Sequence, residues 1–452
     1  MKKLFLTLRL LGAIAAVLLA MLAVILFILS RDIAPTDVSD LMPPARPEAA
    51  PENNAFTYFT QAEELIPKPY EPDVLEQFLV NNECDTNELI KVLADNEAMI
   101  EKIKEGLSKK VCVIPEVSRT YCFSPHIGEW LHIKMVLLAR SKYQLVTGQH
   151  SDALDTCLTH LRFVSLLRRS INDEILFIVC NGMARSALLQ GAHIARSGCL
   201  SEEQLAGLSE ALKEFDGTGQ DCVRVLKYEY QRDAEFFSGR FVEGYLSRAY
   251  GYESEMFSEF KLQPNMVKDL LAVSWREMVR NVQADYSQVK FISNAELLDS
   301  VSYDSRNLAL ILIDKAEYRE SKRKAWMCEL EGLSEFRCCL SAARLIVALN
   351  LYEKRNGKLP DNLAQLEPDF IDSVPCDPYD GKPFRYDRNK EIVYSVGKNL
   401  KDEGGSIEQA YRGNKFQASA RFEAEDYIFG IKKNPFLPSG KNVASRASHQ
   451  GI

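Results

Sequence analysis

The sequence is poor in histidine, and the motifs that it lacks exclude several classes of enzyme. Its six histidines form no His-Glu-x-x-His motif, so nothing supports a zinc hydrolase of that type. A Gly-x-Ser-x-Gly elbow, a Walker loop and a dinucleotide fingerprint are also missing. His126 and His132 lie six residues apart, which does not place two imidazoles on one helical face. We therefore interpret them as partly buried structural residues and predict no catalytic residue.

Cysteine is absent before Cys84, which excludes a lipid-modified N-terminal cysteine. The eleven cysteines are odd in number and irregularly spaced, unlike a disulfide framework, and no pair of CxxC motifs exists for a structural zinc site. Several lie in apolar helical patterns and are expected to be small buried hydrophobes. Cys112 and Cys122 flank a proline-containing loop, and they either pair in an oxidising compartment or stay reduced.

Acidic residues are absent before Asp32, and the run from Leu10 to Leu29 carries no charge at all. Twenty apolar residues in a helix span about 30 Å, the thickness of a bilayer core. Three basic residues precede the run, so residues 1–9 are predicted to be cytoplasmic, residues 10–29 to span the membrane, and the rest to lie outside. A cleaved signal peptide is the alternative, but its apolar region is shorter and ends at small residues that we do not find here.

Acidic residues outnumber basic residues beyond the first nine positions. The formal net charge is −8, and because the first nine residues carry three positive charges, the remainder carries −11. Nucleic-acid binding requires a basic surface, so a nucleic-acid partner is not expected. Self-repulsion that keeps a large soluble region in solution is a sufficient explanation for the acidity.

Most of the soluble region has helical periodicity. Residues 30–53 are proline-rich and predict an extended tether outside any core, and residues 54–333 predict a helical domain. Four helices are expected between Glu129 and Leu212, joined by short turns and packed as antiparallel hairpins, with Gly148 ending the first and Ser201 with Gln204 capping the fourth. One tetratricopeptide-like unit is present without a second copy, so a solenoid is not established.

Two interruptions are expected in the helical pattern. Residues Gly239 to Lys261 are rich in glycine, serine and aromatics and predict an irregular loop, a surface connection or a lid. Further along, Gly332-Leu333-Ser334 predicts a helix break, with Ser334 as the N-cap of the next helix.

The residue pattern changes in residues 334–430, where it predicts a small α+β module. An apolar helical stripe ends at Asn356-Gly357, and it is followed by a turn-rich crossing, two short strands that can form a hairpin, and an acidic glycine loop. This series resembles the C-terminal part of the major pseudopilins of bacterial type II secretion systems. The matching positions are Tyr352, Gly357, Pro360, Pro375, Asp377, Pro378, Tyr379, Pro383, Tyr386, Tyr394, Ser395 and Gly397.

The resemblance implies a calcium ion in the acidic loop, held by Asn399, Asp402, Glu403 and Asp426. Asn399 stands where an aspartate is usual, and a solvated acidic turn without an ion is the alternative. The N-terminus departs from a pilin, because Gly12 is followed by apolar residues and no glutamate occurs in the helix. Processing into a filament subunit is therefore not implied.

As a whole, the chain resembles bacterial membrane-anchored proteins that join an anchor, a helical middle and a pseudopilin-like end. The resemblance implies a single-pass protein of the bacterial inner membrane, with its soluble region in the periplasm and a disordered tail over 431–452. We expect a non-catalytic scaffold with a protein partner, associated with a secretion-type assembly. The alternative is an envelope hydrolase whose active site lies in the helical domain, near the aromatic segment from Tyr245 to Phe260.

Overall fold

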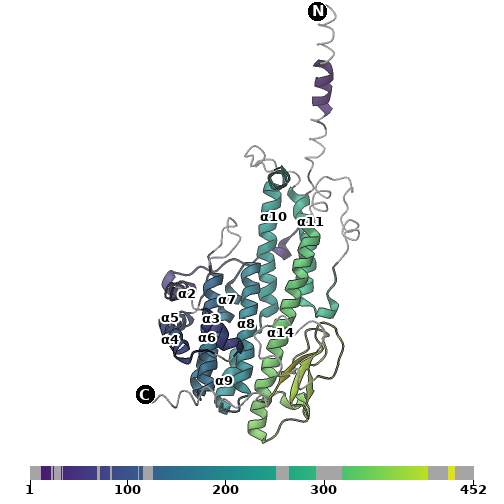
Figure 1. The fold of residues 1–452 in the computed structure, drawn as a ribbon. Coiled ribbons are helices and arrows are strands. Elements are labelled where there is room, and N and C mark those ends of the chain that lie inside the picture. The colour runs from purple at the N-terminus through teal and green to yellow at the C-terminus, as the bar shows by residue number, and fades with distance from the viewer. Residues whose placement is uncertain are drawn as a thin grey trace, which may run out of the picture. The chain divides into compact units, whose positions relative to one another are not determined.

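The computed structural model of the 452-residue chain is mainly helical and carries one small antiparallel sheet, which confirms the general fold class (Figure 1). It describes residues 12–21, 24, 32, 34–68, 72–81, 84–109, 111–115, 126–250, 264–291, 318–405 and 426–432. The described residues form two compact units, one built from 45–225, 281–289 and the chain from 328 onward, the other from the N-terminus to 44, 226–280 and 290–327.

The first unit begins with a helical body. Its elements are η2 (Pro51–Asn53), α2 (Ala55–Glu64), α3 (Pro72–Asn81), α4 (Thr86–Asp95), α5 (Glu97–Leu107), α6 (Ile127–Val146), α7 (His150–Ser170), α8 (Glu174–Ala195) and α9 (Glu202–Lys213). The predicted caps are present: Ser201 and Gln204 form a capping box at the start of α9, and Gly148, with φ +84°, ends the turn between α6 and α7. These local signals fix where the helices begin and end.

Helices α6, α7 and α8 pack as antiparallel hairpins, as the short turns predict. Near the α7–α8 turn, Arg168 of α7 donates a hydrogen bond to Asn181 of α8. Further from the turn, the Cys157 thiol of α7 approaches the Ala187 carbonyl of α8, so the two helices run in opposite directions. α8 is the one described helix long and apolar enough to cross a membrane, and most of it is buried in the fold. It is therefore the core helix of this unit.

Helix α14 (Tyr318–Asn356) contradicts one prediction, because it runs through Gly332-Leu333-Ser334 without a break. A glycine in a helix costs about 1 kcal/mol, and burial of Leu333 and Phe336, which follow Gly332, offsets that cost. From Cys328 onward α14 packs against the helical body. Phe336 contacts Phe215, Glu335 pairs with Arg185, and Arg355 pairs with Glu202 of α9.

The C-terminal module of the first unit consists of the end of α14, the turn η5 (Leu363–Leu366) and the strands β1 (Arg385–Asp387), β2 (Ile392–Ser395) and β3 (Tyr427–Gly430). The predicted hairpin is confirmed: β1 pairs antiparallel with β2. β3 completes the sheet by pairing with the other side of β2, and sequence reasoning did not predict it. Of the predicted tail, Ile431 and Lys432 are described and contact Glu391 and Glu353, and 433–452 lie outside the described residues.

The second unit contains η1 (Ser39–Leu41), the later part of α10 (Thr218–Tyr250), α11 (Pro264–Gln283) up to Arg280, and the beginning of α14. Two predictions were wrong here. Part of the proline-rich segment belongs to a core, because Leu41 is 1% exposed and Arg276 holds Asp40. The predicted loop from Gly239 is helical as far as Tyr250, since α10 continues through it, and 251–261 lie outside the described residues.

The predicted membrane anchor is described only in part. Residues Gly12–Met21 form an apolar helix whose side chains are exposed, with Leu19 at 66%. The rest of the span, apart from Val24, lies outside the described residues.

Candidate functional site in the C-terminal module

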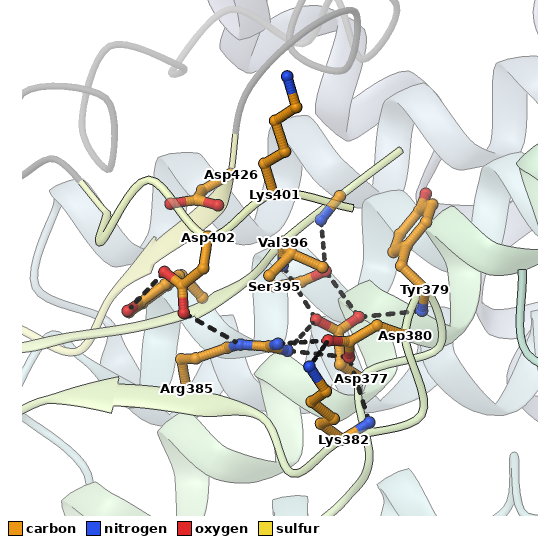
Figure 2. Close-up of polar contacts among 12 residues, drawn as sticks. Asp377, Tyr379, Asp380, Lys382, Arg385, Ser395, Val396, Lys401, Asp402 and Asp426 are labelled. Atoms are coloured by element: carbon orange, nitrogen blue, oxygen red, sulfur yellow. Dashed lines mark hydrogen bonds and ion pairs between the residues drawn. The ribbon is translucent and has the colours of Figure 1, made fainter. Parts of the chain in front are cut away.

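A fully buried carboxylate, Asp377, organises the crossing between α14 and the sheet. It accepts hydrogen bonds from the Ser395 hydroxyl at 2.8 Å, from the Val396 backbone N–H at 2.9 Å and from the Tyr379 N–H at 3.0 Å (Figure 2). Burial raises the pKa of the Asp377 carboxyl, and these donors counteract the increase. The Pro-Cys-Asp-Pro-Tyr sequence therefore ties the crossing to β2 through one side chain.

Arg385 of β1 supplies the compensating charge. Its Nη1 lies 2.7 Å from Asp377 Oδ2, and its other terminal nitrogen pairs with Asp380 at 2.5 Å. Figure 2 shows the guanidinium between these two aspartates on one side and Asp402 on the other. The Arg385 hydrogen bonds hold the pKa of Asp380 below its usual value. One arginine thus connects the crossing, the hairpin and the acidic loop.

Three of the four predicted calcium ligands form a row in which Glu403 contacts both Asn399 and Asp426. The Asn399 amide donates to Glu403 Oε1 at 2.9 Å, and the Glu403 carboxyl neighbours that of Asp426. Asp426 is 6% exposed and accepts the Gly405 N–H at 2.9 Å, which closes the acidic loop onto β3. Burial, with the neighbouring Glu403 carboxyl, raises the pKa of Asp426 to about 6.

The fourth predicted ligand, Asp402, faces a different set of partners. Its Oδ2 lies 3.6 Å from Arg385 Nε, and its Oδ1 accepts the Gly404 N–H at 3.0 Å and the Tyr394 hydroxyl at 3.3 Å. Among the described residues no group of three or more acidic, histidine or cysteine side chains converges on a point where a metal would sit. Asn399, Glu403 and Asp426 provide oxygen donors that suit a hard cation, whereas Asp402 is engaged by a cation of the chain itself.

A tyrosine cluster, which the sequence pattern did not reveal, fixes the module to residues far away in the chain. The Tyr379 and Tyr427 rings lie 5.2 Å apart with their hydroxyls hydrogen-bonded, and Tyr286 packs on Tyr379 at 5.5 Å. The backbone N–H of Tyr286, in η4 (Tyr286–Gln288), donates to the Pro378 carbonyl. The crossing is therefore held by a segment roughly ninety residues earlier.

The remaining candidates lie in the helical body. Cys112 is a buried free thiol, and Cys122 lies outside the described residues. His132 is buried beside Asn96, which agrees with a structural role. His126 is different. The acidic pair Glu63-Glu64 is expected from the sequence to lie on a solvated helix face, but the Glu63 side chain is only 10% exposed, and its carboxylate lies 2.8 Å from His126 Nδ1.

No protein-family model matches the chain, and neither the curated proteins nor the solved structures contain a match to it.

Proposed function

We propose that the chain is a scaffold of the bacterial inner membrane, anchored through residues 10–29 with its N-terminus inside, whose periplasmic C-terminal module binds a protein partner in a secretion-type assembly. Supporting the anchor, Gly12–Met21 is an apolar helix with exposed side chains such as Leu19, and a lipid environment would shield them. Supporting the scaffold, one continuous helix, α14, carries the module and is bonded to the helical body.

The observation that carries the partner proposal is Leu400, on the acidic loop. Its side chain is 42% exposed, and its φ of +59° is a left-handed conformation that β-carbon contacts make unfavourable for leucine. An exposed apolar side chain on a strained backbone contributes little to the free energy of folding. Such outliers cluster at binding surfaces, so we assign Leu400 to the contact with the partner.

Calcium is the proposed cofactor of this loop. Two adjacent carboxyls, Glu403 and Asp426, repel each other when both are ionised, and a divalent cation between them would remove that repulsion. Asn399 would add a neutral oxygen, and Asp402 would contribute only after leaving Arg385. Binding would stabilise the loop that presents Leu400.

The test is proximity labelling in cells with the full chain and a Leu400→Asn variant. Asparagine tolerates a left-handed backbone, so folding should be kept while the apolar contact is lost. We expect the variant to lose a labelled partner that the wild type and a Leu65→Asn control, changed at an exposed leucine of the helical body, both retain. An unchanged set of partners in Leu400→Asn would rule out this surface. Protease protection of the soluble region in intact cells, lost in spheroplasts, checks the topology.

A further inference from the structure

A carboxylate–imidazole pair joins α2 to the start of α6. Glu63 Oε2 lies 2.8 Å from His126 Nδ1, and Glu63 Oε1 accepts the Trp130 indole N–H at 2.8 Å. Both side chains are largely buried, with 10% of Glu63 and 20% of His126 exposed. The indole donor fixes the carboxylate, and the carboxylate in turn fixes the imidazole.

This contact defines which nitrogen of His126 is reactive. An ionised carboxylate only accepts hydrogen bonds, so in the neutral ring Nδ1 carries the hydrogen and Nε2 keeps its lone pair. Within the part of the chain that the structure describes, Nε2 has no hydrogen-bond partner. The ring itself is immobilised, stacked on Trp130 at 5.7 Å and meeting the edge of Phe56 at 5.2 Å.

The imidazole lies between two aromatic side chains, Phe56 and Trp130. A β-carbon added at Gly128, two residues further on, would meet no described atom within 4 Å. The neighbouring rings of Phe56 and Trp130 are apolar surfaces that favour a neutral acyl compound over a phosphate.

We propose that Glu63 and His126 form a hydrolytic site for neutral carboxylic esters, with His126 as its general base. Nε2 takes a proton from a water molecule as the water oxygen bonds to the ester carbonyl carbon. The carbon–oxygen bond to the leaving group then breaks, and the imidazolium returns the proton to the departing alkoxide. One ester and one water yield one acid and one alcohol, and His126 is regenerated.

Glu63 is a positioning residue in this scheme. It holds the tautomer that presents Nε2, and its charge stabilises the imidazolium that forms transiently. The proposed activity lies in the helical body, whereas the proposed scaffold role belongs to the C-terminal module. A test of the esterase activity therefore does not depend on whether the module binds a partner.

The experiment measures hydrolysis of p-nitrophenyl acetate by the full-length protein in detergent micelles. We expect a rate above buffer that falls about 10²–10⁴-fold in His126→Gln, the range of general-base catalysis. His150→Gln, changed at a histidine elsewhere in the body, is the control and should keep the wild-type rate. Glu63→Gln should lower kcat and alter the pH profile, a readout that a purely structural residue would not change.

A second measurement uses the wild-type protein, because a substituted variant that did not fold would also lose activity. Diethylpyrocarbonate should carbethoxylate His126 in parallel with the loss of esterase activity. A wild-type rate equal to that of buffer, a His126→Gln rate equal to wild type, or full activity after complete modification of His126 would each overturn the proposal.

Discussion

Arg385 and Asp377 form a buried ion pair, Nη1 to Oδ2 at 2.7 Å, in which the aspartate is completely inaccessible to solvent. The pair joins β1 to the crossing, and the three hydrogen bonds from Ser395, Tyr379 and Val396 complete the coordination of the carboxylate. Removing the charge of Asp377 breaks the pair at its buried end and leaves the donors that converge on this site without a carboxylate, although Arg385 keeps Asp380 as a partner.

Asp377→Asn should therefore destabilise the module by about 3 kcal/mol or more. Chemical denaturation followed by tyrosine fluorescence measures the change. Asp361→Asn is the matched control, since Asp361 pairs with Arg388 at the surface and is 62% exposed. Its loss should cost less than about 1 kcal/mol, and equal effects of the two variants would contradict the importance of burial.

Asp426 should make the stability of the module depend on pH. Its pKa in the folded chain is about 6, above the ordinary value of 3.8, so the folded state holds its proton more tightly than the unfolded state. The contribution of Asp426 to the free energy of unfolding is fully present below pH 4 and is lost as the pH rises through 6. Its size is about 1–2 kcal/mol after solvent screening. Asp426→Asn should flatten the stability curve between pH 4 and 7, and a curve that keeps its slope would exclude Asp426 as the cause.

Calcium bound to the acidic loop should restore, at neutral pH, the stability that the module loses when Asp426 ionises. A ligand of the folded state at a hundred times its Kd stabilises by about 2.7 kcal/mol, so thermal melts in millimolar calcium and in chelator should separate. Glu403→Gln and Asp426→Asn should abolish the difference, and Asp402→Asn should reduce it less, because Asp402 faces Arg385. Coincident wild-type melts would exclude the site.

Arg168 should stabilise the helical body through its burial among aromatic rings. It is 1% exposed, its guanidinium lies over the faces of Phe177, Phe215 and Phe336, and its Nε donates to Asn181. Arg168→Ala should cost about 3–5 kcal/mol, and Arg168→Met, which retains the volume, less.

The adjacent residue is the control for that measurement. Arg169 is 46% exposed and pairs with Glu214 at the surface, so Arg169→Ala should cost under about 1 kcal/mol in the same denaturation experiment. Equal losses at the two arginines would contradict the special role of the buried one.

Replacement of Gly106 by alanine should lower the stability of the protein, although alanine favours helices. A β-carbon there would lie 2.7 Å from the ring of Phe59, which is fully buried and cannot move away. Gly106→Ala should destabilise by about 1–3 kcal/mol. At Gly182 in α8 a β-carbon would meet nothing within 4 Å, so Gly182→Ala should stabilise by up to about 1 kcal/mol. Thermal unfolding compares the two, and stabilisation by Gly106→Ala would show that the contact is not tight.

Local signals explain most of the correct predictions. The Ser201–Gln204 capping box, the Gly148 turn and the β1–β2 hairpin depend on residues within a few positions of each other, so the sequence pattern shows them directly. The same local reasoning failed at Gly332, because a single glycine signals a break while the burial of Leu333 and Phe336 outweighs it.

The sequence by itself determined the helical character of the chain, the boundaries set by caps and turns, and the apolar N-terminal segment. Tertiary structure decided the rest: that β3 joins the sheet, that Arg385 lies 3.6 Å from Asp402, and that Glu63 contacts His126 across 63 positions. Periodicity reports which face of an element is apolar, but it carries no information on which distant charges meet. Those contacts form only once packing brings the elements together, and they distinguish a buried ion pair from a solvated turn.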